Sequence, residues 1–379
     1  MLAALQGILG WIPIGLPAFL FVVTVVVFFH ELGHFSVARL FGVRIETFSI
    51  GFGPAIAHWL DRKGTQWKIS WVPLGGYVKF FGDMSAASTP DREKIETMSA
   101  AERAEAFPFK PLYQRALIVL AGPVANFILA ILIFFASYAL IGEPIAGTGV
   151  GDVTKGGPAA SAGIQKGDVI KVVNGQATDS FAKLRQAIEK AGNKPLAMTV
   201  DRHGRPFTTT AKPAVIATKD IFGTPMKIRG IGIAPADEAW NVIFVKVSPL
   251  QAASDAGYQT FGVAQLSLTY VWRIVSGRAD TSQLTGPVGM AEASRKAASS
   301  GFVYLIGLAA LISVSIGLIN LFPIPILDGG HLLYYACEAV LGRPLGERAQ
   351  DVGFRLGLAV VLGLFFLATW NDLVRPNLF

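Results

Sequence analysis

Four long apolar segments, almost free of charged residues, divide the chain. They run over Ile12–Ala38, between Arg115 and Glu143, over Gly301–Leu327 and over Leu356–Asn371. The first three exceed the ~20 residues that a helix needs to cross a bilayer. The fourth has 16 residues, but a basic and an aromatic residue at its ends are typical of membrane interfaces. The pattern predicts a polytopic α-helical membrane protein with four transmembrane helices.

The polar regions between these segments follow other patterns. Residues 48–81 combine glycine with aromatic and β-branched residues, which favours strands and tight turns, whereas Ser85–Lys110 is typical of a polar loop. Residues 143–235 contain several strand candidates and one amphipathic helix, which predicts a compact α+β domain. Residues 236–300 predict amphipathic helix and loop. The predicted divisions are 1–40, 41–114, 115–142, 143–235, 236–300, 301–330 and 331–379.

Composition and charge narrow the class of protein. Apolar residues make up 52% and charged residues 16% of the chain, against about 25% charged in soluble domains, which excludes an ordinary soluble enzyme. The net charge is +7, with no Lys or Arg before Arg39 and eleven within residues 39–115. The positive-inside rule therefore predicts a cytoplasmic 39–115 loop and an external N-terminus. No nucleic-acid motif accompanies the charge, and the single Cys337 excludes an intramolecular disulfide and a cysteine-based metal cluster.

The first apolar segment carries the HExxH pattern, His30-Glu31-Leu32-Gly33-His34. Positions i and i+4 share one face of a helix, so the two imidazoles can bind one zinc ion, with Glu31 placed to take a proton from water. Ionisable residues at the end of an apolar span are costly without a partner. A chance match is therefore disfavoured, and the pattern predicts a zinc-dependent hydrolase.

A catalytic zinc site needs a third protein ligand, and the end of the third apolar segment offers two. Asp328 follows Leu327 at the end predicted to be cytoplasmic, on the side of His30 and His34. Its ordinary role would be a helix cap, and His331 is the rival ligand. We favour Asp328, because His331 lies further toward the aqueous side.

Two prolines interrupt the same segment. Pro323 and Pro325 lack the backbone N–H, and each disfavours helix in the residue before it. Irregular backbone at membrane depth is tolerated only in a protein-lined or hydrated cavity. The segment is therefore predicted to open beside the metal site, and a simple kink is the alternative. Gly122-Pro123 with Asn126 in the second apolar segment predicts close helix packing, with Asn126 able to hydrogen-bond between helices.

Taken together, these motifs resemble the site-2 protease family, and within it the bacterial regulator of sigma-E protease type. The residues that carry the resemblance are the HExxH pattern, Gly51-Phe52-Gly53-Pro54, Pro73-Leu74-Gly75-Gly76-Tyr77-Val78, Ala121-Gly122-Pro123 with Asn126, and Asn320 with Leu327-Asp328-Gly329. The resemblance covers nearly the whole chain.

The resemblance implies an intramembrane zinc endopeptidase with one Zn²⁺ per chain. It implies His30, His34 and Asp328 as zinc ligands and Glu31 as the general base. The 48–81 region would be a cytoplasmic, membrane-associated β-hairpin that presents an edge strand to the substrate. The substrate-binding residues would be Asn320, Pro323, Pro325, Gly75, Gly76 and Tyr77.

The resemblance also implies partners and a location. The expected partners are single-span membrane proteins, including pre-cleaved anti-sigma factors and remnant signal peptides, together with membrane lipid and a protease that cuts the substrate first. Nucleic acid is not expected. The expected location is the bacterial inner membrane, with the N-terminus and the α+β domain in the periplasm and the active site near the cytoplasmic face.

The 143–235 domain resembles a PDZ domain, and the chain has room for one where well-known members have two. Gly230, Ile231, Gly232 and Ile233 resemble a carboxylate-binding loop that could capture a free C-terminus, or form an ordinary strand. Two other functions stay open: a PDZ-bearing membrane scaffold and a zinc transporter. A transporter would be expected to show repeats or a polar path through several spans.

Overall fold

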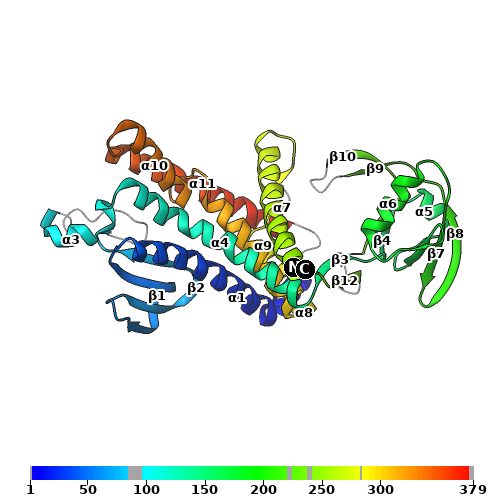
Figure 1. Ribbon diagram of the computed structural model, residues 1–379, viewed down its shortest axis with the longest axis horizontal. Helices are drawn as coiled ribbons and strands as arrows, with labels where there is room; N and C mark the ends of the chain where they lie inside the picture. Colours follow the sequence, from blue (N-terminus) through cyan, green and yellow to red (C-terminus); the bar gives the residue numbers. More distant parts are fainter. Residues whose placement is uncertain (1, 84–95, 220–223, 237–240, 282–283, 375–379) are drawn as a thin grey trace. The chain divides into compact units, whose positions relative to one another are not determined.

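The computed structural model describes residues 2–83, 96–219, 224–236, 241–281 and 284–374. The chain forms two compact units. The first comprises Met1–Phe134, Asp255–Leu268 and Ser282–Phe379, and the second comprises Phe135–Ser254 and Thr269–Thr281. Helices dominate the first unit and strands the second (Figure 1).

Among the described residues, four helices are long and apolar enough to cross a membrane: α1 (Leu2–Leu40), α4 (Leu112–Leu140), α9 (Phe302–Asn320) and α11 (Glu347–Val374). The prediction of a four-span helical membrane protein is confirmed. Helix α8 (Pro287–Ser300) lies against α1 and α9. There Val22 of α1 and Ala309 of α9 are fully buried in a shared apolar cluster. This contact holds together α1, which carries the HExxH residues, and α9, which ends at Asn320.

The third apolar segment is not one continuous helix. Helix α9 stops at Asn320 and α10 (Asp328–Leu341) starts after seven intervening residues, so the helix does not run through to residue 330 but opens around Pro323 and Pro325, as those prolines predicted. Pro323 and Pro325 explain the break, because neither can donate a helical hydrogen bond. The expected loop after residue 331 is replaced by the rest of α10. Gly357 of α11 packs directly on the carbonyl group of Pro325, where a side chain would not fit.

The segment after α1 folds into the expected hairpin of β1 (Ile45–Leu60) and β2 (Gln66–Phe80). Both strands bend, so residues 47–50 of β1 pair with residues 66–69 on one side and with 76–79 on the other. Residues 76–79 therefore form an outer strand whose second edge is unpaired among the described residues. The hairpin packs beside α1 through a core that contains Phe35, Phe48 and Ile118 (Figure 1).

Part of the expected loop over 85–110 is helical. Residues 84–95 lie outside the described residues, but α3 (Ala100–Glu105) and the 3₁₀ turn η1 (Phe107–Phe109) follow. The Ser99 hydroxyl accepts a hydrogen bond from the Glu102 backbone N–H, and the Glu102 carboxylate accepts one from the Ser99 backbone N–H. This capping box is a recognised helix start signal, and it explains why so polar a segment forms a helix.

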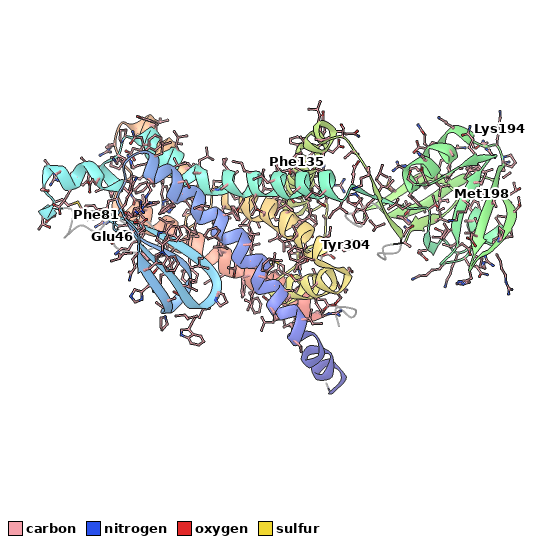
Figure 2. The ribbon with its side chains drawn as sticks, turned by 60° about the horizontal axis from the view of Figure 1, so that its bottom comes forward. Glu46, Phe81, Phe135, Lys194, Met198 and Tyr304 are labelled. Atoms are coloured by element: carbon pink, nitrogen blue, oxygen red, sulfur yellow. The ribbon has the colours of Figure 1, made fainter. Side chains whose placement is uncertain are left out.

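The second unit is an α+β domain. Its four-stranded antiparallel sheet has the order β6 (Gln176–Ala177), β5 (Val169–Val173), β7 (Leu196–Arg202), β8 (Arg205–Ala211). Leu184 and Ile188 of α6 (Phe181–Ala191) are buried in its core. Figure 2 shows Met198 in the interior of this unit and Lys194 at its margin.

Shorter elements complete this domain. They are β3 (Glu143–Ala146), β4 (Val150–Val153), α5 (Pro158–Ser161), β9 (Ala214–Lys219), β10 (Pro225–Gly230), β11 (Ile233–Pro235) and β12 (Val242–Val245). Because β12 pairs with β3, the expected boundary at residue 235 is wrong and the domain runs on to Val245. Beyond it, α7 (Pro249–Val275) is one long helix with exposed apolar residues.

We expect Asp168→Asn to destabilise the α+β domain. Burial alone would raise the pKa of the Asp168 carboxyl, but hydrogen bonds from Arg202 (2.7 and 2.8 Å) and from the Gln165 N–H hold that pKa below its usual range. A lowered folded-state pKa means that this stabilisation is present above the unfolded pKa of about 4 and is lost as pH falls below it. Removing the charge should cost about 2 kcal/mol at pH 7.

Protection of the domain from trypsin in the full-length protein measures this effect. The matched control is Asp179→Asn, which removes an exposed carboxylate paired with Lys183 and should change little. Equal protection of wild type and Asp168→Asn at neutral pH would contradict the expectation.

Candidate active site

Helices α1 and α4 approach each other closely at the HExxH pattern. Gly33 of α1 lies against the carbonyl oxygen of Ala121, and Gly122 of α4 lies against the imidazoles of His30 and His34. A Cβ atom at residue 122 would overlap His34 Nε2. The absence of side chains at these two glycines therefore leaves the space in which both imidazoles sit.

Three donor atoms converge at this point: His30 Nε2, His34 Nε2 and Asp328 Oδ2. The two imidazole nitrogens lie 3.2 Å apart, and the carboxylate oxygen lies 3.2 Å from His30 and 3.5 Å from His34. Two imidazoles and one carboxylate are a common catalytic zinc set, and bonds of about 2 Å in a tetrahedron separate the ligand atoms by about 3.3 Å. The residues present fit a zinc ion. Both histidines are buried, each 8% exposed.

The ring of His34 is oriented by a backbone group. Its Nδ1 lies 2.9 Å from the carbonyl oxygen of Ile118 in α4. A carbonyl oxygen can only accept, so Nδ1 carries the proton and Nε2 presents a lone pair to the site. Hydrogen bonding of the outer nitrogen is the usual way in which a ligand histidine is fixed.

Asp328 is positioned by the irregular segment between α9 and α10. It is the first residue of α10, where the helix dipole favours a carboxylate. Gly329 and Gly330 follow, and a Cβ on either would overlap carbonyl groups of residues 321–324. Ile326 takes a positive φ of 102°, which is rare for a β-branched residue and occurs most often at functional sites.

The three donor atoms lie at the wall of a cavity of about 310 Å³. The residues that line it include His30, Glu31, His34, Asp328, Asn320, His331, Gly75, Gly76 and Tyr77. Glu31 accepts a hydrogen bond from the Val78 backbone N–H, and a Cβ at residue 76 would contact the Glu31 side chain. The outer strand of the hairpin, residues 76–79, therefore borders the proposed base and the three donor atoms.

Of three further candidate residues, one lines this cavity and two do not. His331 lines the cavity but is not part of the metal-binding cluster among the described residues. Pro325 lines a second cavity of about 590 Å³, which shares Ile326 and His331 with the first. Pro323 lines neither of the two.

The candidate peptide-binding loop belongs to the α+β domain. Gly230 ends β10 and Ile233 starts β11. Ile231 is buried in the domain core, and its carbonyl accepts the Ala159 N–H. The carbonyl of Gly232 accepts the Thr154 N–H. Ile231 thus serves the core, which the sequence pattern alone did not indicate.

Comparison with known protein families matches residues 18–364 to peptidase family M50. The chain belongs to this family. A putative zinc metalloprotease of Agrobacterium fabrum is 43% identical over 94% of both chains. The metalloprotease MmpA of Caulobacter vibrioides is 39% identical over 96% of both. This M50 protein is therefore a zinc metalloprotease and a multi-pass membrane protein, and its substrates are proteins.

Among solved structures, the chain is similar to the PDZ domain of an SdrC-like protein from Listeria monocytogenes. The similarity covers 24% of this chain and 90% of that one, at 27% identity and a TM-score of 0.20. The family match and the two relatives confirm the predictions of a zinc-dependent enzyme and of the M50 (site-2 protease) family.

We expect Gly122→Ala to remove most zinc binding from the M50 protein. The added methyl group would occupy the space of His34 Nε2 and Cε1, and the helix backbone gives it no other direction. The affinity for zinc, measured against a chelating indicator in detergent, should fall by about 100-fold or more, since even indirect supports of a ligand are worth 10–100-fold. Proteolytic activity should fall with it.

Gly307→Ala in α9 is the matched control. The Cβ position at Gly307 has nothing within 4 Å, so this variant should bind zinc and cleave substrate as wild type does. Normal zinc affinity in Gly122→Ala would show that the two helices are further apart than described.

Proposed function

We propose that this M50 protease hydrolyses peptide bonds inside the transmembrane segments of single-span membrane proteins. The observation that carries the proposal is the position of the site. The HExxH residues lie within the apolar span Pro13–Leu40, and Asp328 follows the end of another span, α9. A protease with its site at the ends of membrane spans is suited to substrates that are themselves in the membrane.

We assign His30, His34 and Asp328 as the zinc ligands and Glu31 as the general base. Zinc bound there supplies a Lewis acid that polarises a carbonyl group and makes water more acidic. Glu31 takes a proton from the attacking water while the water oxygen bonds to the scissile carbonyl carbon. The protonated Glu31 then gives that proton to the amide nitrogen as the C–N bond breaks, which releases an amine.

A transmembrane helix must first open, because its backbone groups are bonded to one another. We propose that the extended substrate adds to the unpaired edge of residues 76–79 as a β-strand. The proximity of this edge to Glu31 supports the assignment, and Gly75, Gly76 and Tyr77 would then contact substrate. Asn320, on the same cavity, is placed to hydrogen-bond the strand. Pro323 and Pro325 keep the segment beside it open.

The basic residues from Arg39 to Arg115 support a site near the cytoplasmic face of a bacterial inner membrane. The α+β domain would then be periplasmic and would act like a PDZ domain, admitting substrates that another protease has shortened. Pre-cleaved anti-sigma factors and remnant signal peptides are the substrate classes of this kind. Exposed Trp59 and Trp71 on the hairpin would contact membrane lipid.

The test is cleavage in liposomes that contain only the purified protein and a single-span substrate. Two forms of the substrate are compared, one with its outer domain intact and one with that domain removed. We expect faster cleavage of the shortened form, loss of cleavage with a zinc chelator and recovery when zinc is returned. Cleavage that persists in the chelator, or that occurs only with soluble proteins, would contradict the proposal.

A further inference from the structure

Asn126 of α4 is a buried amide in an otherwise apolar span. Its side chain is 0% exposed, and its Nδ2 lies 3.2 Å from His30 Nδ1. Helix α9 packs against the same residue. The Ser313 hydroxyl donates to the backbone carbonyl of Asn126 at 2.8 Å, and the Cβ position of Gly317 lies 3.0 Å from Asn126 Cβ. A polar side chain at this depth is costly unless it has a defined partner. The imidazole of His30 is that partner.

The proposed ligation of His30 fixes which atom Asn126 must offer. His30 faces the donor cluster through Nε2, so Nε2 needs a free lone pair to bind zinc. A neutral imidazole then carries its proton on Nδ1. An N–H at Nδ1 requires an acceptor, and the amide nitrogen of Asn126 cannot be one.

The amide oxygen of Asn126 can accept this proton. Asn126 Oδ1 is buried and has no hydrogen-bond partner among the described residues. A half-turn of the amide exchanges Oδ1 and Nδ2 within the same space and brings the oxygen to the position 3.2 Å from Nδ1. Without that turn, the amide would donate to Nδ1 and the proton would move to Nε2, which blocks ligation.

We propose that Asn126 is the positioning residue of the zinc site, and that its side-chain oxygen accepts from His30 Nδ1–H. This inference rests on the proposed assignment of His30 as a ligand. It gives the two histidines matching supports from one helix, since Ile118 supplies a backbone carbonyl to His34 and Asn126 supplies a side-chain carbonyl to His30. Only the second support can be removed by substitution. Such supports set the tautomer and ring direction of a ligand and are worth 10–100-fold in metal affinity.

Zinc affinity of the purified full-length protein tests the proposal. In Asn126→Leu, which keeps the volume but has no acceptor, the affinity should fall by about 10–100-fold. In Asn126→Asp, which accepts but cannot donate, the affinity should stay close to wild type. The absorption spectrum of the Co²⁺-loaded protein should be altered in the Leu variant and retained in the Asp variant. Ser315→Ala, which removes a hydroxyl bonded to its own helix at Leu311, is the control.

Each outcome bears on a different claim. Wild-type affinity in Asn126→Leu would overturn the proposal. Loss of zinc in Asn126→Asp as large as in the Leu variant would also overturn it, because the amide nitrogen would then be the atom that matters. If Asn126→Leu does not fold, the Asp variant alone decides. His30→Ala should lose zinc; if it keeps zinc, the ligand assignment fails instead.

Discussion

Replacing Glu31 with Gln is expected to abolish proteolysis while zinc binding stays normal. Gln has the shape of Glu but cannot take a proton from water, and general-base catalysis typically contributes 10²–10⁴-fold. Glu31 lines the cavity beside the donor cluster but is not one of the three clustered ligand atoms. The cleavage rate of a single-span substrate should therefore fall by at least about 100-fold, with zinc content per chain unchanged.

The control for this variant is Glu46→Gln. Glu46 lies on the hairpin (Figure 2) and pairs with Lys79 at 3.0 Å, so the substitution removes a carboxylate from the same unit without touching the cavity. It should leave zinc content normal and the cleavage rate within a few-fold of wild type, as expected for a partly exposed ion pair. Full activity in Glu31→Gln would exclude Glu31 as the base, and loss of zinc in that variant would point to a ligand role.

Asp328→Asn is expected to lose both zinc and cleavage. The substitution keeps the side-chain shape at the start of α10 but replaces an anionic ligand oxygen with a neutral one. The carboxylate lies 3.2 and 3.5 Å from the two imidazole nitrogens, and no other acidic residue joins this cluster among the described residues. Zinc content of protein purified with a limited zinc supply should fall to a small fraction of wild type.

His331→Ala separates the two candidates for the third ligand. His331 follows Asp328 by one helical turn and lines the same cavity, yet it is not among the clustered donor atoms. The His331→Ala variant should therefore keep its zinc. Retained zinc in Asp328→Asn together with lost zinc in His331→Ala would reverse the assignment.

Local patterns predicted the parts of this structure that depend on a single segment. Uninterrupted apolar runs predicted all four membrane helices, because a bilayer leaves few other structures for them. The i and i+4 spacing placed His30 and His34 on one face of α1. Pro323 and Pro325 indicated that the helix would open beside the site, and α9 does end at Asn320.

Features that depend on partners far apart in the sequence were missed or misplaced. The pairing of β3 with β12 joins segments about 100 residues apart, and the sequence of neither strand indicates its partner. The sequence indicated that Asn126 is able to hydrogen-bond between helices, but its partner, His30, follows only from the packing of α4 on α1. Gly122 was predicted to permit close helix packing, and the structure shows that it makes room for two imidazoles. The prediction of a loop over Ser85–Lys110 missed α3, although the capping box of Ser99 and Glu102 is a local signal.

Mass spectrometry of the cleavage products is the most direct test of the central claim. A single-span substrate is incubated with zinc-loaded wild-type protein in liposomes, and the new termini are identified, with Glu31→Gln as the blank. We predict one or a few cut bonds inside the apolar span, absent from the blank and from chelator-treated samples. Cuts confined to the soluble parts of the substrate, or the same cuts with Glu31→Gln, would contradict intramembrane proteolysis by this site.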